Sequence, residues 1–173
     1  MRKPKKKQQK NDLPVTLLGT LFLLMLVVMV VALAAPKEPT RGEFIPPDFE
    51  VNAVSGTPEV PDSLGYSAPF QEGMAYRFAV CGNVTIEDGQ ALVYFTNPAE
   101  NTTWIKLRLY DEAGVLLGET GLLKPGAYVQ YVALNQVPSP GTLIQLKIMG
   151  YEPDTYLSAG SVVLNTRTGG ASE

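Results

Sequence analysis

Four side chains that can recognise a ligand occupy alternate positions in one short segment. Trp104, Lys106, Arg108 and Tyr110 alternate with isoleucine and leucine residues. A period of two is typical of a β-strand, so the four polar and aromatic side chains should share one strand face. Such a stripe can stack on sugars or hold an acidic polymer through cation–π and ionic contacts. The alternative is that a neighbouring segment covers Trp104 and the two bases are merely solvated.

Residue types elsewhere argue against catalysis. The chain contains no histidine, which is the commonest general base and metal ligand. Cys81 is the single cysteine and lies in an apolar run, so we expect it to pack as a small hydrophobic side chain. Without histidine, a Ser–Lys pair is the remaining conventional route to a nucleophile, and the sequence has no S-x-x-K motif. We therefore predict a protein that is not an enzyme and has no catalytic residues and no cofactor.

Acidic residues gather at three expected turns rather than in a metal-binding pattern. None of these pairs has the density of oxygen ligands found in a calcium loop. Turn chemistry explains them, and we predict no metal site. The three pairs are Glu87 and Asp88, Asp111 and Glu112, and Glu152 and Asp154.

An uncharged apolar stretch begins at Leu13 and ends at Ala35, directly after a basic head at residues 1–12. As a helix, residues 13–35 would extend about 35 Å, enough for a hydrocarbon core of about 30 Å. The Lys/Arg-rich side stays in the cytoplasm according to the positive-inside rule. We expect one transmembrane helix in contact with the lipid bilayer, a cytoplasmic N-terminus and an extracellular C-terminus.

A cleavable signal peptide is the competing interpretation of the same stretch. Ala32, Leu33 and Ala34 form an A-x-A-like tripeptide, and cleavage after Ala34 would release a secreted domain. The apolar run is much longer than the roughly 7–15 residues of a typical signal h-region, which favours an uncleaved anchor.

Charge is segregated along the chain. The head at residues 1–12 carries a net charge of about +5, whereas the residues after Ala35 carry about −8. An acidic outer domain lacks the basic surface that nucleic acid requires, so we expect no nucleic-acid partner.

The residues after the apolar stretch divide into a linker, a β domain and a polar tail. Residues 36–72 are rich in proline and show no sustained period, which predicts an extracytoplasmic linker. Residues 73–166 contain about seven short β-type runs separated by turn residues such as Asp88–Gly89. In two of these runs alternating apolar residues should face a shared core: Ile105, Leu107 and Leu109 in one, and Ile144, Leu146 and Ile148 in the other. We predict an all-β fold, a single immunoglobulin-like β-sandwich, followed by a polar tail at residues 167–173. The run at residues 128–134 is ambiguous in register.

Three segments carry a resemblance to known proteins. Residues 97–101 read NPAEN, residues 107–114 read LRLYDEAG and residues 121–126 read GLLKPG. This pattern of turn residues resembles that of small single-pass membrane-anchored surface proteins of Gram-positive bacteria with one immunoglobulin-like domain. The resemblance implies a surface location and transfers no functional residue.

The sequence therefore favours a membrane-anchored binding or accessory module of a bacterial surface assembly, with a protein or cell-wall partner outside the cell. A structural stalk or scaffold subunit, whose span associates with a membrane partner, is the first alternative. A secreted domain released after Ala34 is the second.

Overall fold

The computed structural model describes residues 13–34, 45–68 and 75–169. The predicted cytoplasmic head therefore lies outside the described residues, as do residues 36–44 and 69–72 of the predicted linker, residues 73–74 of the predicted domain and residues 170–173 of the predicted tail. The chain divides into two compact units, one ending at Phe44 and the other beginning at Ile45. Each unit is described by itself below.

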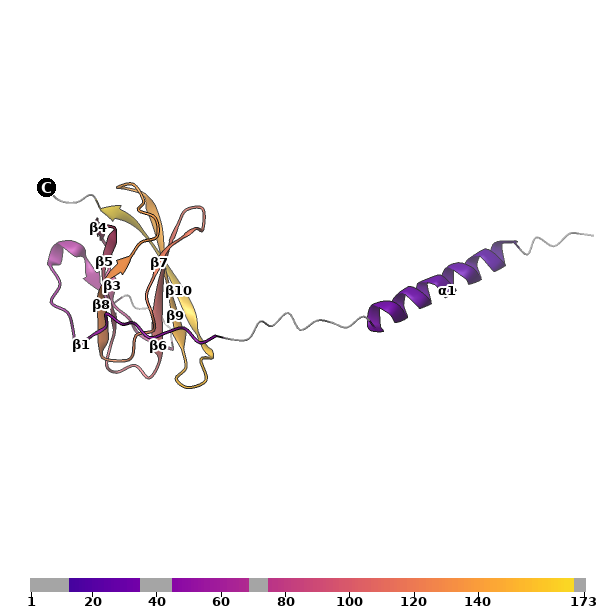
Figure 1. Cartoon of the computed structure of the whole chain (residues 1–173), viewed down its shortest axis with the longest axis horizontal. Helices are drawn as coiled ribbons and strands as arrows, with labels where there is room; N and C mark the ends of the chain where they lie inside the picture. Colours follow the sequence, from indigo (N-terminus) through magenta and orange to yellow (C-terminus); the bar gives the residue numbers. More distant parts are fainter. Residues whose placement is uncertain (1–12, 35–44, 69–74, 170–173) are drawn as a thin grey trace, which may run out of the picture. The chain divides into compact units, whose positions relative to one another are not determined.

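The first unit contains helix α1, Leu13–Ala34 (Figure 1). Leucine, valine, methionine and alanine dominate the helix, and Pro14 lies in its first turn, where a missing N–H costs little. Side chains are described for residues 17–31, and all of them are exposed. Among the described residues, none of the helical segments combines the length and the apolar character that a membrane crossing requires. The helix therefore forms where we expected one, and the transmembrane assignment is not supported by the described residues.

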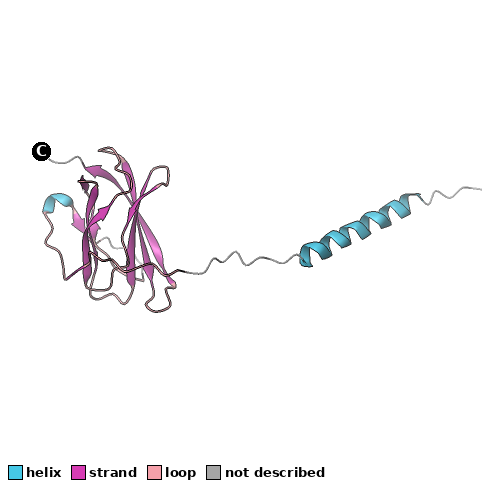
Figure 2. Cartoon of the chain, in the orientation of Figure 1, coloured by secondary structure: helices cyan, strands magenta, loops and turns pink. Residues whose placement is uncertain are grey.

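The second unit is built almost entirely from strands (Figures 1 and 2). Within the described residues, one sheet has eight strands in the order β1-β8-β5-β4-β10-β9-β6-β7, and β2 pairs with β3 in a second sheet. The elements are β1 (Val54–Ser55), the 3-10 helix η1 (Asp62–Leu64), β2 (Tyr66–Ser67), β3 (Val80–Cys81), β4 (Val84–Glu87), β5 (Gln90–Asn97), β6 (Trp104–Asp111), β7 (Leu116–Glu119), β8 (Ala127–Ala133), β9 (Leu143–Tyr151) and β10 (Ser158–Gly169).

Alternating side chains on β6 and β9 form the centre of the core. The two strands pair antiparallel, with Leu107 opposite Ile148 and Leu109 opposite Leu146. These four side chains are almost completely buried. The expected inward rows on these strands are confirmed, because one face of each strand packs against the interior. The coarse prediction of a mostly β domain is confirmed as well.

The large sheet curls until its β7 end approaches β8. The amide of Asn135, just after β8, donates to the carbonyl of Leu117 in β7 at 2.7 Å. Gly118 faces the Ala133 carbonyl so closely that a Cβ would overlap it. The eight strands of the large sheet are hydrogen-bonded in one continuous order. The immunoglobulin-like topology stays a prediction.

The compact β unit begins well before the predicted domain boundary at residue 73. Residues 45–68 belong to it and contribute β1, η1 and β2. β1 extends the sheet by pairing Val54 with Tyr128 of β8. The described part of the predicted linker is thus a structured part of the domain. At the other end, β10 continues to Gly169, beyond the expected end at residue 166.

Close packing at Gly150 provides a test of this core. Gly150 in β9 lies under the ring of buried Tyr76, whose hydroxyl donates to the carbonyls of Ile148 and Gly160. A Cβ at residue 150 would overlap that ring. We expect Gly150→Ala to lower the free energy of unfolding by about 2 kcal/mol, the usual scale of overpacking. Urea denaturation followed by the fluorescence of Trp104, the single tryptophan, measures the change.

Gly169→Ala is the matched control, because a Cβ there meets only ordinary contacts with Thr85 and Val84. Equal stability of the two variants would contradict the close packing of Gly150 beneath Tyr76.

Candidate functional site

The predicted stripe on β6 is covered at one end by the chain's own residues 45–51, which we call the strap. The strap runs alongside the segment after β7 in a parallel bridge between Phe49 and Leu122. The Leu122 amide donates to the Asp48 carbonyl at 2.8 Å, and the Glu50 amide donates to the Leu122 carbonyl at 2.9 Å. Backbone hydrogen bonds therefore hold the strap on the sheet.

The strap approaches the rest of the domain most closely at Gly121. A Cβ at this position would overlap the backbone of Phe49 and Glu50. Its amide donates to the Glu50 carboxylate at 2.7 Å, which adds a charge-assisted contact to the backbone pairing. Only a residue without a side chain lets the two backbones approach this closely.

Trp104 lies between the strap and the loop that joins β9 to β10. Its ring meets Phe49 edge-on with the centroids 4.8 Å apart, and Tyr156 with the centroids 5.4 Å apart. The ammonium of Lys124 lies 4.6 Å from the centroid of the Phe49 ring. The tryptophan thus takes part in an internal aromatic cluster, as the covering alternative had anticipated.

Lys106 is buried, with a relative exposure of 6%. Simple alternation had placed this side chain on a solvated face, and that expectation is wrong. Its ammonium lies 2.9 Å from one Glu119 carboxylate oxygen, and Arg108 Nε donates to the other at 2.7 Å. β7 brings Glu119 opposite Arg108, and one carboxylate therefore neutralises two bases.

The Glu119 carboxyl has a pKa below its ordinary value. Burial by itself would raise this pKa, but hydrogen bonds from Lys106 and Arg108 and the charges of both bases outweigh burial. The carboxylate is accordingly ionised at neutral pH. An open groove of about 480 Å³ lies beside the ion pairs, between the strap and β6–β7.

Tyr110 lies at the far end of β6, opposite Gln145 of β9 and Leu116 of β7, and is half-buried. The predicted four-residue stripe is therefore divided: Lys106 is buried, whereas Trp104, Arg108 and Tyr110 are partly accessible. The use of these residues for binding stays a prediction.

A second groove, on β8, was missed because the register of residues 128–134 was ambiguous in the sequence. It has a volume of about 330 Å³. Two tyrosines and a glutamine close together in β8 are the sequence signal that marks this region. The groove is lined by Asn52, Val54, Gln90, Val129, Gln130, Tyr131 and Ala133.

The single cysteine of the domain is held in an unreactive form. Cys81 is completely buried, and burial raises the pKa of its thiol to about 11. A protonated thiol is a poor nucleophile. Among the described residues, no three acidic, cysteine or histidine side chains gather as a metal site. Comparison with protein-family models, with curated proteins and with solved structures gives no match for this chain.

The ion pairs under the strap generate a prediction on stability. We expect Glu119→Gln to lower the free energy of unfolding at neutral pH by about 2 kcal/mol, because it leaves Lys106 buried without a countercharge. This figure is smaller than for a fully buried pair, since the Glu119 side chain is 36% exposed. Lys106→Met is the control: Glu119 keeps Arg108 as its partner, and the loss should stay below about 1 kcal/mol.

The effect of Glu119 depends on pH in a defined direction. A carboxyl whose pKa is lowered by folding stabilises the protein above its unfolded-state pKa, and this contribution disappears as the pH falls through the folded-state pKa. The gap between the wild type and Glu119→Gln should therefore shrink between pH 7 and about pH 3 in urea denaturation. A gap that is unchanged over this interval would contradict the role of the ionised carboxylate.

Proposed function

We propose that this protein is a non-enzymatic binding or accessory module anchored in a membrane by α1, with the β domain outside the cell. The observation that carries the proposal is the apolar circumference of α1. Every described large hydrophobic side chain from Leu17 to Val31 is between 47% and 72% exposed. A helix that is apolar on all sides requires lipid or protein around it, because exposure of this much apolar surface to water is unfavourable.

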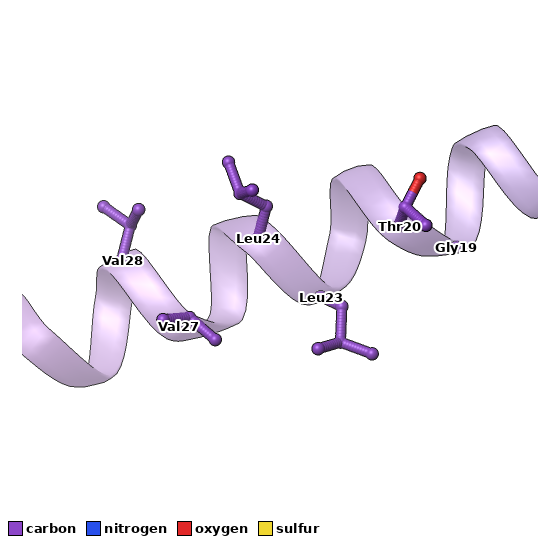
Figure 3. Close-up of a pocket in the computed structure, with 6 residues that line it drawn as sticks. All are labelled: Gly19, Thr20, Leu23, Leu24, Val27 and Val28. Atoms are coloured by element: carbon purple, nitrogen blue, oxygen red, sulfur yellow. The ribbon is translucent and has the colours of Figure 1, made fainter.

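Figure 3 shows six residues of α1, whose side chains are apolar except for the hydroxyl of Thr20. Leu24 and Val28 project on one side of α1, and Leu23 projects on another (Figure 3). The hydroxyl of Thr20 donates to the Leu17 carbonyl at 2.9 Å, so this polar group has its partner within the helix. A helix that satisfies its polar groups internally is suited to an apolar environment. The basic head that precedes it supports a cytoplasmic N-terminus.

The chemistry of the β domain supports binding rather than catalysis. The sequence has no histidine, and the thiol of Cys81 is buried and protonated at neutral pH. The grooves beside the strap and on β8 offer surfaces for a partner. A surface location also agrees with the resemblance to single-pass surface proteins of Gram-positive bacteria.

Two alternatives remain open. In a scaffold subunit, α1 itself would contact the partner, and a photocrosslinker at residue 24 would capture a neighbour that one at residue 131 does not. In a secreted protein, cleavage after Ala34 would free the β domain, and the intact mass of the mature chain would lack residues 1–34.

Membrane retention of the full chain tests the proposal. We expect the wild type to stay with the membranes after an alkaline carbonate wash, and protease added to intact cells to digest the β domain. The double variant Leu24→Arg and Val28→Arg should move into the wash, because each arginine costs about 2.5–3.5 kcal/mol or more at the centre of a bilayer. Immunoblotting of the fractions measures the distribution.

Leu157→Arg with Val163→Arg is the matched control, because both side chains are exposed apolar residues of the β domain. This variant should stay with the membranes. Release of the wild type by the wash, or retention of the α1 double variant, would overturn the proposal.

A further inference from the structure

The groove on β8 is uncharged and rich in carboxamides. Asn52 approaches from the end of the strap, Gln90 begins β5, and Gln130 and Tyr131 come from β8. None of the described residues that line it is a lysine, arginine, aspartate or glutamate. Its volume of about 330 Å³ lies within the range of small-molecule sites, roughly 300–1,000 Å³. A ligand for this groove should be neutral, polar and small in cross-section.

A strained tyrosine orients one of these carboxamides. Tyr94 has φ 44°, in the left-handed region that bulky side chains rarely adopt. It lies at a bulge, where the pairing of β5 with β8 shifts between Leu92 and Phe95. Its hydroxyl accepts a hydrogen bond from Gln130 Nε2 at 2.9 Å. Bulges of this kind redirect a side chain, and strained backbone of this kind is concentrated at functional sites.

The hydrogen bond from Gln130 Nε2 to the Tyr94 hydroxyl fixes the plane of the Gln130 side-chain amide. The amide oxygen of Gln130 stays available as an acceptor. The hydroxyl of Tyr94 also keeps its proton, since burial and the nearby hydroxyls of Tyr131 and Tyr128 raise its pKa. Among the described residues, no hydrogen bond joins the side-chain amide of Asn52 or Gln90, or the hydroxyl of Tyr131, to another group of the protein. The groove thus presents unused donors and acceptors around one aromatic ring.

These features fit a carbohydrate. A carboxamide offers a donor and an acceptor side by side, which matches neighbouring hydroxyls of a sugar. An aromatic ring such as that of Tyr131 can stack on the apolar C–H face of a sugar ring while the tyrosine hydroxyl remains exposed to water. The absence of charge from the lining disfavours acidic polymers and phosphates.

We propose that the groove formed by Asn52, Gln90, Gln130 and Tyr131 binds a neutral glycan chain. This inference rests on the proposed function, because it names the class of ligand that the surface module would capture. Tyr131 stacks on one sugar ring, Gln130 is held by Tyr94 to bind its hydroxyls, and Asn52 and Gln90 bind the hydroxyls at the edges of the groove. Tyr94 is a positioning residue that acts through Gln130.

The test uses the full chain in a zwitterionic detergent without sugar head groups. The probes are maltotetraose, cellotetraose and N-acetylated chitotetraose, and saturation-transfer-difference NMR and calorimetric titration measure binding. We expect saturable binding of at least one probe. Tyr131→Ala should weaken it by about tenfold or more through lost stacking. Gln130→Ala should weaken it by about fivefold through lost hydrogen bonds.

Two further substitutions separate ligand contacts from folding. Tyr131→Phe keeps the ring and should retain most of the affinity, whereas Tyr94→Phe should weaken binding by about threefold because Gln130 loses its partner. Tyr151→Ala and Gln145→Ala are the matched controls, because both side chains are half-buried and lie on β9, outside the groove. Thermal unfolding confirms that each variant is folded.

Absence of binding of all three sugars by the folded wild type would overturn the proposal. Equal loss in the β9 controls, or capture of an acidic polysaccharide or an extended peptide in place of the neutral sugars, would overturn it too. None of these results bears on membrane retention, so failure of the glycan site and failure of the membrane module are distinguishable.

Discussion

The burial of one ammonium group constrains much of the β domain. Lys106 is enclosed, and a buried cation is tolerated only with a countercharge in close contact. Glu119 supplies it, and this requires β7 to pair with β6 in the register that places Glu119 opposite Arg108. With β7 in this register, the carbonyl of Leu117 accepts a hydrogen bond from the amide of Asn135, just after β8. This bond closes the curl of the large sheet.

The core itself follows directly from sequence periodicity. Alternation on β6 and β9 correctly predicted which side chains face inward, because a half-buried strand leaves a period of two in the sequence. Turn dipeptides such as Asp88–Gly89 correctly marked the strand ends, with both residues at positive φ between β4 and β5. Local chemistry was therefore sufficient for most of the strands after residue 80.

The strap could not be predicted in the same way. It is held by backbone hydrogen bonds to Leu122, by the Glu50 carboxylate, which accepts from the Gly121 amide, and by the aromatic ring of Phe49. None of these contacts produces a periodic pattern. The proline-rich composition of the strap is equally typical of an extended linker. Lys106 was misplaced for the same reason, because alternation identifies the face of a strand but not whether another segment covers that face. The groove on β8 was hidden by the bulge at Tyr94, which shifts the register against β8.

The strap connects the candidate site under it to the groove on β8. Glu50 accepts the Gly121 amide through one carboxylate oxygen and the Asn52 amide through the other, at 2.7 and 3.0 Å. Asn52 lines the groove, and Val54 begins the strand that pairs with β8 beside it. A change that lifts the strap from Gly121 would therefore also displace one wall of the groove. The strap is the first part of the β unit. The hydrogen bonds that hold the strap on the sheet therefore also hold one wall of the proposed ligand site in place.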